Sequence, residues 1–248
     1  VWVNPTDHTA SDVGDEPLLL AAAAPTMVAR DRPAGARAIE ADKTATHIIM
    51  DDGLQNPTLA KSLTIAVVDG VRGLGNGEVI PAGPLRATLD VQFELTDAIL
   101  VNGGGPEAPI LQELRSAFPG PVLSAAVEPQ YGDEAFSGAR VVAYAGIGNP
   151  ARFTASLKQA GASVVAERFF KDHHTYSESD ARELIALADA NNARLVTTQK
   201  DQVRLRATSA ALAELAQRSE ALRITMVLEA RDLARLEELI DPARLSHE

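Results

Sequence analysis

The stretch THIIMDDGLQNP, residues 46–57, decides the first interpretation of this sequence. An apolar run, Ile48–Met50, leads straight into Asp51 and Asp52 and then into a glycine. A buried parallel strand delivers carboxylates to its C-terminal edge in this way. The pattern is typical of a Walker B strand, whose aspartate holds Mg²⁺ against the phosphates of a nucleotide. It therefore predicts that these acids lie at the edge of a parallel sheet.

The companion of a Walker B strand in P-loop enzymes is a Gly-rich loop, G-x-x-x-x-G-K-[ST], that cradles the phosphates. The 248 residues contain no such loop, and no glycine is followed by lysine. Two explanations stay open: the acid pair ends an ordinary strand, or the chain has lost an N-terminal part that carried the loop. The first residue is valine and not methionine, which favours the second explanation.

Composition bounds the class of protein. A chain of 248 residues with 46% hydrophobic content is long enough for one large or two modest α/β domains. The 34 acids and 23 bases give a net charge of −11, which disfavours binding to nucleic acid. The absence of cysteine excludes disulfides and thiolate metal sites and fits a reducing interior. The longest apolar run, residues 17–28, falls short of the roughly 20 residues that span a bilayer.

Short β-branched runs alternate with Ala- and Leu-rich segments, which predicts βα units around a mostly parallel sheet with helices on both faces. We expect strands near Ile48–Met50, Thr64–Asp69, Ala98–Asn102, Val141–Ala145, Ser163–Ala166, Arg194–Thr197 and Ile224–Val227.

Helix signals fall between these strands. Asn149 followed by proline predicts a capped helix over Ala151–Ala160. Ser177 with Asp180 approximates a capping box and predicts a helix that runs to about Asn191.

The chain is predicted to form two domains. Residues 1–137 would be the remainder of a P-loop NTPase-like domain, with the Walker B strand and no Walker A loop. Residues 138–248 would be a second, smaller α/β domain. The polar, turn-rich segment at residues 129–138 is the candidate joint. We expect the last helix, residues 231–245, to pack back on the first domain, and an active cleft to lie between the domains.

The acids in VGDEPLLLA, residues 13–21, stand just before a helix whose first position we take to be Pro17. Asp15 and Glu16 there can simply complement the helix dipole. They can also join the acids of residues 51–52 at the carboxyl edge of one sheet, where α/β proteins bind ligands. Such an oxygen cluster suits Mg²⁺.

Three further motifs keep two interpretations each. GLGNGEVIPAGPLR, residues 73–86, is a tight glycine turn in which Arg86 is the residue suited to an anion. YAGIGNPARF, residues 144–153, resembles a dinucleotide loop but lacks its third glycine. In LVTTQKDQVRL, residues 195–205, Lys200 and its neighbouring aspartate cap a helix or reach a phosphate.

The segment FFKDHHTYSESD, residues 169–180, allows three uses. It can be a polar turn. Asp172, His173 and His174 can form the ligand triplet of a metal-dependent phosphoesterase. A histidine of the pair can instead face an acid elsewhere and take part in proton transfer.

Six motifs in this order resemble the tetraacyldisaccharide 4′-kinase family of lipid A biosynthesis: GDEP, DDGLQ, GNGEVIPAGPLR, AGIGNPARF, the Asp-His-His loop and TTQKD. The resemblance covers the chain from Val13 to about Leu205. It implies ATP-dependent transfer of a phosphoryl group to the 4′-hydroxyl of a tetraacylated glucosamine disaccharide 1-phosphate. It also implies a peripheral location at the cytoplasmic face of a Gram-negative inner membrane.

In the family, the Walker A loop and a membrane-associating segment lie upstream of GDEP. We therefore expect this chain to be an N-terminally truncated and inactive fragment of such a kinase.

The resemblance also implies residue roles. Asp15 looks like the general base, and His173 matches the family histidine that pairs with it. For Mg²⁺, the resemblance implies Asp51 and Asp52 as ligands, with Glu16 and Gln55 as their neighbours. For the phosphates of the substrate or nucleotide, it implies contacts from Arg32 and Arg86.

Two rival functions remain. One is a metal-dependent phosphoesterase that uses the loop at residues 172–174 and needs no ATP. The other is a non-catalytic fragment that binds lipid or a partner. The sequence leaves the oligomeric state and the roles of His174 and Lys200 open.

Overall fold

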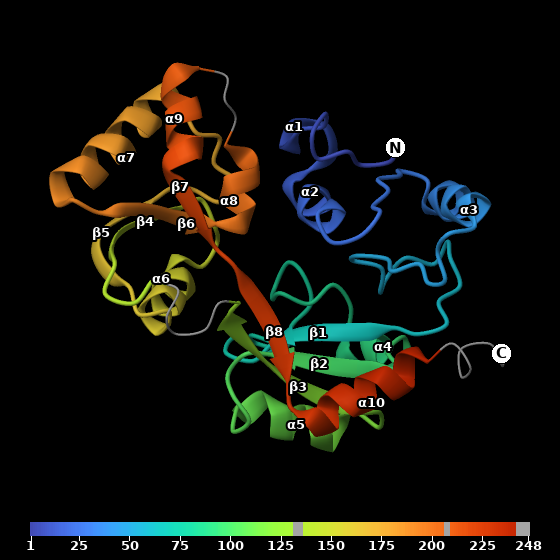
Figure 1. Cartoon of the computed structure of the whole chain (residues 1–248). Helices are drawn as coiled ribbons and strands as arrows, with labels where there is room; N and C mark the ends of the chain where they lie inside the picture. The colour runs from blue at the N-terminus through green and yellow to red at the C-terminus, as the bar shows by residue number, and fades with distance from the viewer. Residues whose placement is uncertain (131–135, 206–208, 242–248) are drawn as a thin grey trace. The chain divides into compact units, whose positions relative to one another are not determined.

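The computed structural model describes residues 1–130, 136–205 and 209–241, which fall into two compact units (Figure 1). Unit 1 comprises residues 1–31 and 128–225, and unit 2 comprises residues 32–127 and 226–248. The compact units have boundaries different from those of the predicted domains. The division of the chain between residues 137 and 138 stays a prediction. Most of the predicted joint lies at residues 131–135, outside the described residues.

Unit 1 is built on a four-stranded sheet in the order β5-β4-β6-β7, in which all neighbouring strands are parallel. Its strands are β4 (Arg140–Ala145), β5 (Ser163–Phe169), β6 (Arg194–Thr198) and β7 (Ser219–Leu222). Residues 141–145 are fully buried, as expected for a central strand that is covered on both faces.

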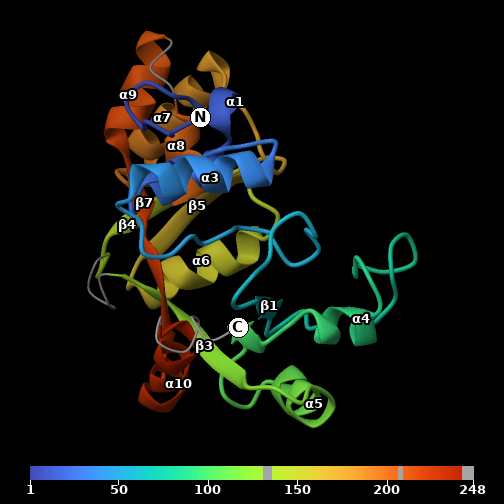
Figure 2. The ribbon, with the colours of Figure 1, turned by 90° about the vertical axis from the view of Figure 1, so that its right-hand side faces the viewer.

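Helices cover both faces of this sheet (Figures 1 and 2). On one face, Phe153 and Leu157 of α6 (Pro150–Gln159) pack on the strands. On the other face lie α7 (Glu178–Asn191) and α9 (Ala210–Arg218). Both predicted helix starts are confirmed, because the N–H of Arg152 donates to the Asn149 side chain and a capping box joins Ser177 to Asp180.

The N-terminal segment belongs to unit 1 and carries two short helices, α1 (Ala10–Val13) and α2 (Asp15–Ala21). A single antiparallel bridge between Trp2 and Met27 closes the segment. Helix α2 packs against α8 (Gln199–Arg204), which follows directly after β6. Thr198 caps α8, since its side chain accepts a hydrogen bond from the N–H of Asp201.

Unit 2 is built on a sheet in the order β1-β2-β3-β8, in which β1, β2 and β3 are parallel. Its strands are β1 (Ile65–Asp69), β2 (Ala98–Asn102), β3 (Val122–Pro129) and β8 (Ile224–Leu228). Its helices are α3 (Arg32–Asp42), α4 (Leu89–Glu94), α5 (Pro109–Ala117) and α10 (Ala230–Ile240). Helix α5 packs on one face of the sheet, and Leu236 and Leu239 of α10 pack on the other.

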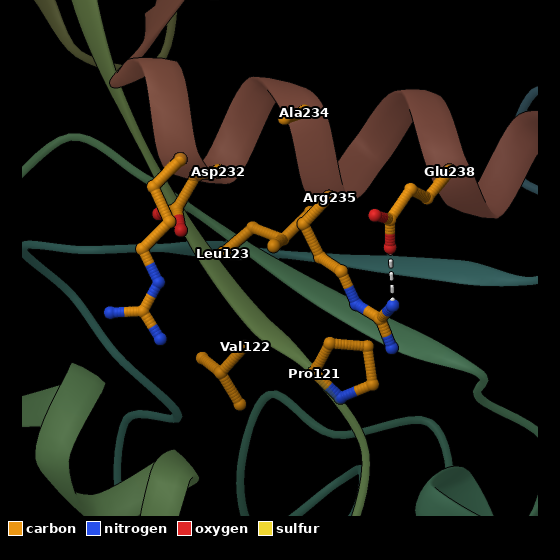
Figure 3. A pocket seen from close by; sticks show the side chains of 8 residues that line it. Pro121, Val122, Leu123, Asp232, Ala234, Arg235 and Glu238 are labelled. Carbon is orange, nitrogen blue, oxygen red and sulfur yellow. Dashed lines mark hydrogen bonds and ion pairs between the residues drawn. The ribbon is translucent and has the colours of Figure 1, made fainter.

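Helix α10 is fixed to the sheet by more than apolar contact. The N–H of Ser124 donates to the Asp232 carboxylate over 2.8 Å. A groove of about 400 Å³ lies between α10 and β3, and on its α10 side Arg235 pairs with Glu238 of the same helix at 2.7 Å (Figure 3). None of the residues with predicted site roles lines this groove.

The α/β class predicted from the sequence is confirmed, but the strand that led to it is not. Residues 46–50 form no strand, and Ile49 is 94% exposed. A strand needs a neighbour for its backbone N–H and C=O groups, and among the described residues the sheet of unit 2 ends at β1. The apolar run that leads into the two acids indicated a strand, but it carried no information on which other strand would pair with it.

The six other predicted strands are found, and β3 and β7 are additional. β7 has only four residues, and both strands contain alanine, serine and a glutamate, which weakens the β signal in their sequence. In the part of the chain that is described, no helix has the length and apolar character needed to cross a bilayer.

Candidate functional site

Asp15 is the first residue of α2, so the helix begins two residues earlier than predicted from Pro17. Gly14 precedes it with φ 92°, a left-handed conformation that turns the chain from α1 into α2 and that glycine adopts without strain. Proline fits at the third position, since first-turn N–H groups have no partner within the helix. The Asp15 side chain is only 12% exposed.

His173 lies in the loop between β5 and α7. It has φ 57°, and its N–H donates to the carbonyl of Gly146 over 3.1 Å and to the Asp172 carboxylate over 3.0 Å. Its side chain is 65% exposed. The backbone is thus fixed, while one face of the imidazole stays open to solvent.

Asp15 and His173, predicted as a pair, lie together in unit 1. The Nδ1 of His173 is 3.6 Å from Oδ2 of Asp15. A third residue, Arg204, joins them: its Nη2 donates to Oδ2 of Asp15 and lies 3.1 Å from Nδ1 of His173. Arg204 and Asp15 are 189 residues apart in the sequence.

The charge of Asp15 is set by this arrangement. Burial alone would raise the pKa of the Asp15 carboxyl, but the hydrogen bond and charge of Arg204 outweigh it, with help from the backbone N–H at the helix start and from His173. The net effect lowers the pKa, so Asp15 is a carboxylate at neutral pH.

Arg204 is held in turn by Asp201, a fully buried carboxylate one helical turn before it. Asp201 accepts hydrogen bonds from the N–H of Gly146 at 3.0 Å, from Tyr176 at 2.9 Å and from Thr198 at 2.6 Å. Burial and the nearby Asp201 charge raise the pKa of Tyr176, which keeps its hydroxyl a donor. The buried charge is therefore satisfied from three elements.

Gly146, the first glycine of the AGIGNP motif, is explained by close packing. A Cβ there would lie 2.9 Å from Cβ of His174 and 3.0 Å from the carbonyl of Lys171. The glycine lets the histidine loop and Asp201 approach the end of β4, and this gives the motif a packing role that requires no dinucleotide.

His174 has a partner set different from that of His173. Its ring stacks on Phe170, with centroids 4.5 Å apart, and its Nε2 lies 3.1 Å from the Asp180 carboxylate. Since Asp180 also closes the capping box of α7, His174 ties the histidine loop to the start of that helix.

Glu16 and Lys200 form an ion pair in unit 1. The resemblance placed Glu16 beside a metal, and the sequence left the role of Lys200 open between a helix cap and a phosphate contact. With the Asp15–Arg204 pair, this ion pair gives two acid–base contacts between α2 and α8. Both members of this second pair are about half exposed, so the pair is accessible to solvent and ligands.

The remaining predicted site residues belong to unit 2. Asp52, with φ 51° and a 63% exposed side chain, accepts from Nη1 of Arg86 at 2.9 and 3.0 Å. Asp51 is exposed, and Gln55 is partly buried in the same irregular segment. Arg32 is the exposed first residue of α3. Within the described ranges, no three histidine, aspartate or glutamate side chains gather closely enough to hold a metal ion.

Sequence reasoning missed Arg204 and Asp201 as members of this site. A signal was present, because the two residues are three apart in a segment that was already singled out, and such a spacing places opposite charges on one face of a helix. What the sequence did not reveal is that α2 packs on that face.

A profile of the family described as tetraacyldisaccharide-1-P 4′-kinase (LpxK) matches residues 1–242. The chain belongs to this family.

Relatives of the chain in this LpxK family are similar along most of its length. It is 51% identical over 226 residues to a tetraacyldisaccharide 4′-kinase of Methylorubrum extorquens strain PA1, covering 90% of this chain and 66% of the relative. It is 46% identical over 249 residues to one of Azorhizobium caulinodans, covering 98% of this chain and 73% of the relative. A Methylobacterium nodulans relative is 51% identical and is covered over 62% of its length. The chain thus spans about two thirds of the length of these LpxK relatives.

A solved structure of the LpxK family shares the fold. It is a crystal structure of LpxK from Aquifex aeolicus, an "apo" form in complex with ATP, with a TM-score of 0.68. The match covers 96% of this chain and 71% of that chain at 22% identity. The P-loop kinase type of α/β fold that the sequence predicted is thereby confirmed.

Proposed function

We propose that this chain is the catalytic-base part of an LpxK-type kinase, which uses ATP to phosphorylate the 4′-hydroxyl of a tetraacylated glucosamine disaccharide 1-phosphate. The observation that carries the proposal is the meeting of Asp15 with His173, both named from the family resemblance, around Arg204 in unit 1. We further propose that the protein works peripherally at the cytoplasmic face of a Gram-negative inner membrane, where such a lipid is accessible.

The chemistry needs a base, because a sugar hydroxyl is a poor nucleophile at neutral pH. Asp15 is ionised and points from a helix start, so it can accept the hydroxyl proton. His173 offers an exposed imidazole beside it that can share the proton. Positioned general-base assistance contributes on the order of 10²–10⁴-fold in rate.

The oxygen-rich segment of unit 2 fits Mg²⁺ by its donor chemistry, since Mg²⁺ prefers carboxylate and amide oxygens. When bound, Mg²⁺ would neutralise charge on the phosphates of ATP. We propose Asp51, Asp52 and Gln55 as its ligands, with Arg86 released from Asp52 to contact phosphate. Glu16 as a further metal residue and Arg32 as a phosphate contact remain predictions.

The 248 residues contain no Walker A sequence. We propose that these residues alone hold MgATP weakly and are inactive as a kinase. Calorimetry on the 248-residue chain tests this, and micromolar ATP affinity would overturn it.

The function is tested with the full gene product, labelled ATP and the tetraacyldisaccharide 1-phosphate. We expect Asp15→Asn and His173→Ala each to lower kcat by on the order of 10²-fold or more, with the KM for ATP little changed. His8→Ala is the matched control, since the His8 ring accepts a hydrogen bond from the N–H of Asn4 and has no predicted site role, so the variant should retain full activity.

The Asp15 and His173 variants also discriminate the proposed dyad. Residues that act as one unit lose activity non-additively. The double variant should therefore be scarcely slower than the slower single variant, and losses that multiply would contradict the pairing.

The phosphoesterase alternative gains no support from the loop geometry, because His173 and His174 are turned to different partners. Release of phosphate from p-nitrophenyl phosphate with Mn²⁺ and without ATP, abolished by His174→Ala, would favour that alternative over the kinase. Lipid binding with no transfer from ATP by the full gene product would favour a non-catalytic role.

A further inference from the structure

Arg204 is a buried cation with four acceptors around it. Its side chain is 7% exposed. Beyond Asp15 and His173, its Nη1 donates to the carbonyl of Gly146 over 2.9 Å and lies 3.3 Å from Oδ1 of Asp201. A guanidinium so enclosed has no surface left for a substrate, and its contacts are to the residues that form the site.

The anchor of this guanidinium is independent of Asp15. Asp201 is held by the N–H of Gly146 and by two hydroxyls, from the end of β4, the histidine loop and the start of α8. The position of Arg204 therefore rests on contacts outside α2. Asp15 meets a cation that is held independently of it.

The hydrogen bond to His173 has only one possible direction. A guanidinium donates and never accepts, so Nδ1 of His173 must be the acceptor over the 3.1 Å contact. A neutral imidazole whose Nδ1 accepts carries its proton on Nε2. Nδ1 and Oδ2 of Asp15 are then two acceptors 3.6 Å apart, linked through one NH₂ group.

We propose that Arg204 is a positioning residue that fixes the Asp15 carboxylate and sets the tautomer of His173. Its structural half concerns this chain alone, and its catalytic half rests on the function proposed above. Arg204 leaves the proton of His173 on Nε2, where the Asp172 carboxylate lies 3.9 Å away and a substrate group can also meet it. Without Arg204, Asp15 becomes the nearest partner of Nδ1 and draws the proton there.

The structural half is tested by nitrogen-15 NMR of histidine-labelled 248-residue chain at pH 8, with His173→Gln used to assign the signals. We expect His173 to carry its proton on Nε2. In Arg204→Met, which keeps the length of the side chain and removes every donor, the proton should move to Nδ1. Arg204→Lys keeps a donor and should keep the Nε2–H form.

The matched control is Arg218→Met, which breaks the contacts of Arg218 to Asp189 and Glu214 in the same unit and should leave the tautomer unchanged. Emission from Trp2, the one tryptophan of the chain, reports whether the variants retain the N-terminal segment. If Arg204→Met fails to fold, the wild-type and Arg204→Lys spectra still decide. A proton on Nδ1 in the wild type, or an unchanged tautomer in a folded Arg204→Met chain, overturns the proposal.

The catalytic half is tested in the full gene product. We expect Arg204→Met to lower kcat by about 10²-fold, the scale of a misplaced reacting group, without raising the KM for ATP. If Asp15→Asn and His173→Ala also leave kcat unchanged, the proposed function is wrong. If those two lower kcat and Arg204→Met does not, the role of Arg204 is wrong and the function stands.

Discussion

Two acid pairs, Asp15-Glu16 and Asp51-Asp52, raise the same expectation in the sequence and differ sharply in the structure. The first begins a helix and is held by two bases of α8, with Asp15 nearly buried. The second lies in an irregular segment, where Asp52 meets one exposed arginine. The difference shows that an acid pair becomes a defined site through the element that packs on it, and its flanking sequence does not decide this.

Helix α8 explains why the first pair is held. Lys200 and Arg204 are four residues apart, so both project from one face of the helix. The adjacent acids at the start of α2 meet one base each. Asp201, one turn earlier on the same helix, contacts Arg204 and helps to hold it in place. In unit 2, the partner of Asp52 is Arg86 from the glycine turn, which is neither helix nor strand.

Hydrogen exchange should show the largest contrast between these regions. Amides of β6, buried between β4 and β7, should exchange at least about 10³-fold more slowly than those of Ile48–Met50, which have no strand partner. Mass spectrometry of peptic fragments of the 248-residue chain measures this. Protection of Ile48–Met50 comparable to that of β6 would show that the segment pairs with a strand, and the comparison between the acid pairs would collapse.

The second prediction concerns the buried support of the first acid pair. Asp201→Ala should destabilise the chain by about 3–5 kcal/mol, because it removes one of the two carboxylates around the buried Arg204 and the acceptor of the Gly146 N–H and of two hydroxyls. Urea denaturation followed by far-UV circular dichroism and by Trp2 emission measures the loss.

Asp52→Ala is the matched control in the other region. It removes an exposed carboxylate and should change the free energy of unfolding by no more than about 0.5 kcal/mol. Equal losses for Asp201→Ala and Asp52→Ala would refute the distinction between a supported and an unsupported acid pair.

The third prediction uses pH on the loop that carries His173. Burial alone would raise the pKa of Asp180. Hydrogen bonds from the backbone and hydroxyl of Ser177, together with His174, lower the pKa by more than burial raises it, so the folded pKa lies below the unfolded value of about 3.9. Its stabilisation is therefore complete above about pH 4 and is lost as pH falls through the folded pKa. Asp180→Asn should cost about 1 kcal/mol at pH 7, and the deficit should shrink below about pH 4.

Glu178→Gln serves as the control for that prediction, since Glu178 stands in the same first helical turn but contacts only Arg182 on the surface. Its effect on stability should be small across the same pH range. A deficit of Asp180→Asn that persists unchanged to pH 2 would contradict the sign derived from the Asp180 pKa.

The contrast between the acid pairs also indicates how far the sequence could be interpreted. Local signals were sufficient where the information is local: the caps at Asn149 and Ser177 and the strands β2, β4 and β6 follow from adjacent residues. The family motifs placed Asp15 and His173 in one site. That the two lie in one unit with Arg204 between them depends on contacts across 189 residues, which no window of sequence contains.

The prediction of a Walker B strand was wrong because it also depended on a distant contact. Its residue pattern was right for a buried strand, but burial requires a partner that the pattern does not name. Asp201 lies at a helix start, as one of its two interpretations had it, but its buried environment comes from Gly146 and Tyr176, which are far from it in sequence.

The last prediction compares the exposed ion pair of each region and expects the smallest effects. Glu16–Lys200 and Asp52–Arg86 each join side chains that are about half exposed. Such pairs contribute about 0–1 kcal/mol, because water screens the charges and two flexible side chains are ordered. Lys200→Ala and Arg86→Ala should therefore each shift the free energy of unfolding by less than about 1 kcal/mol. Salt at about 0.5 M, where the screening length is roughly 4–5 Å, should remove most of either shift. Urea titrations at low and high salt measure both. Because Lys200 sits beside the buried Arg204 contact, a loss in Lys200→Ala that is several-fold larger and insensitive to salt would mean that the two contacts of α2 act as one unit, and that the exposed pair is part of the support of Asp15.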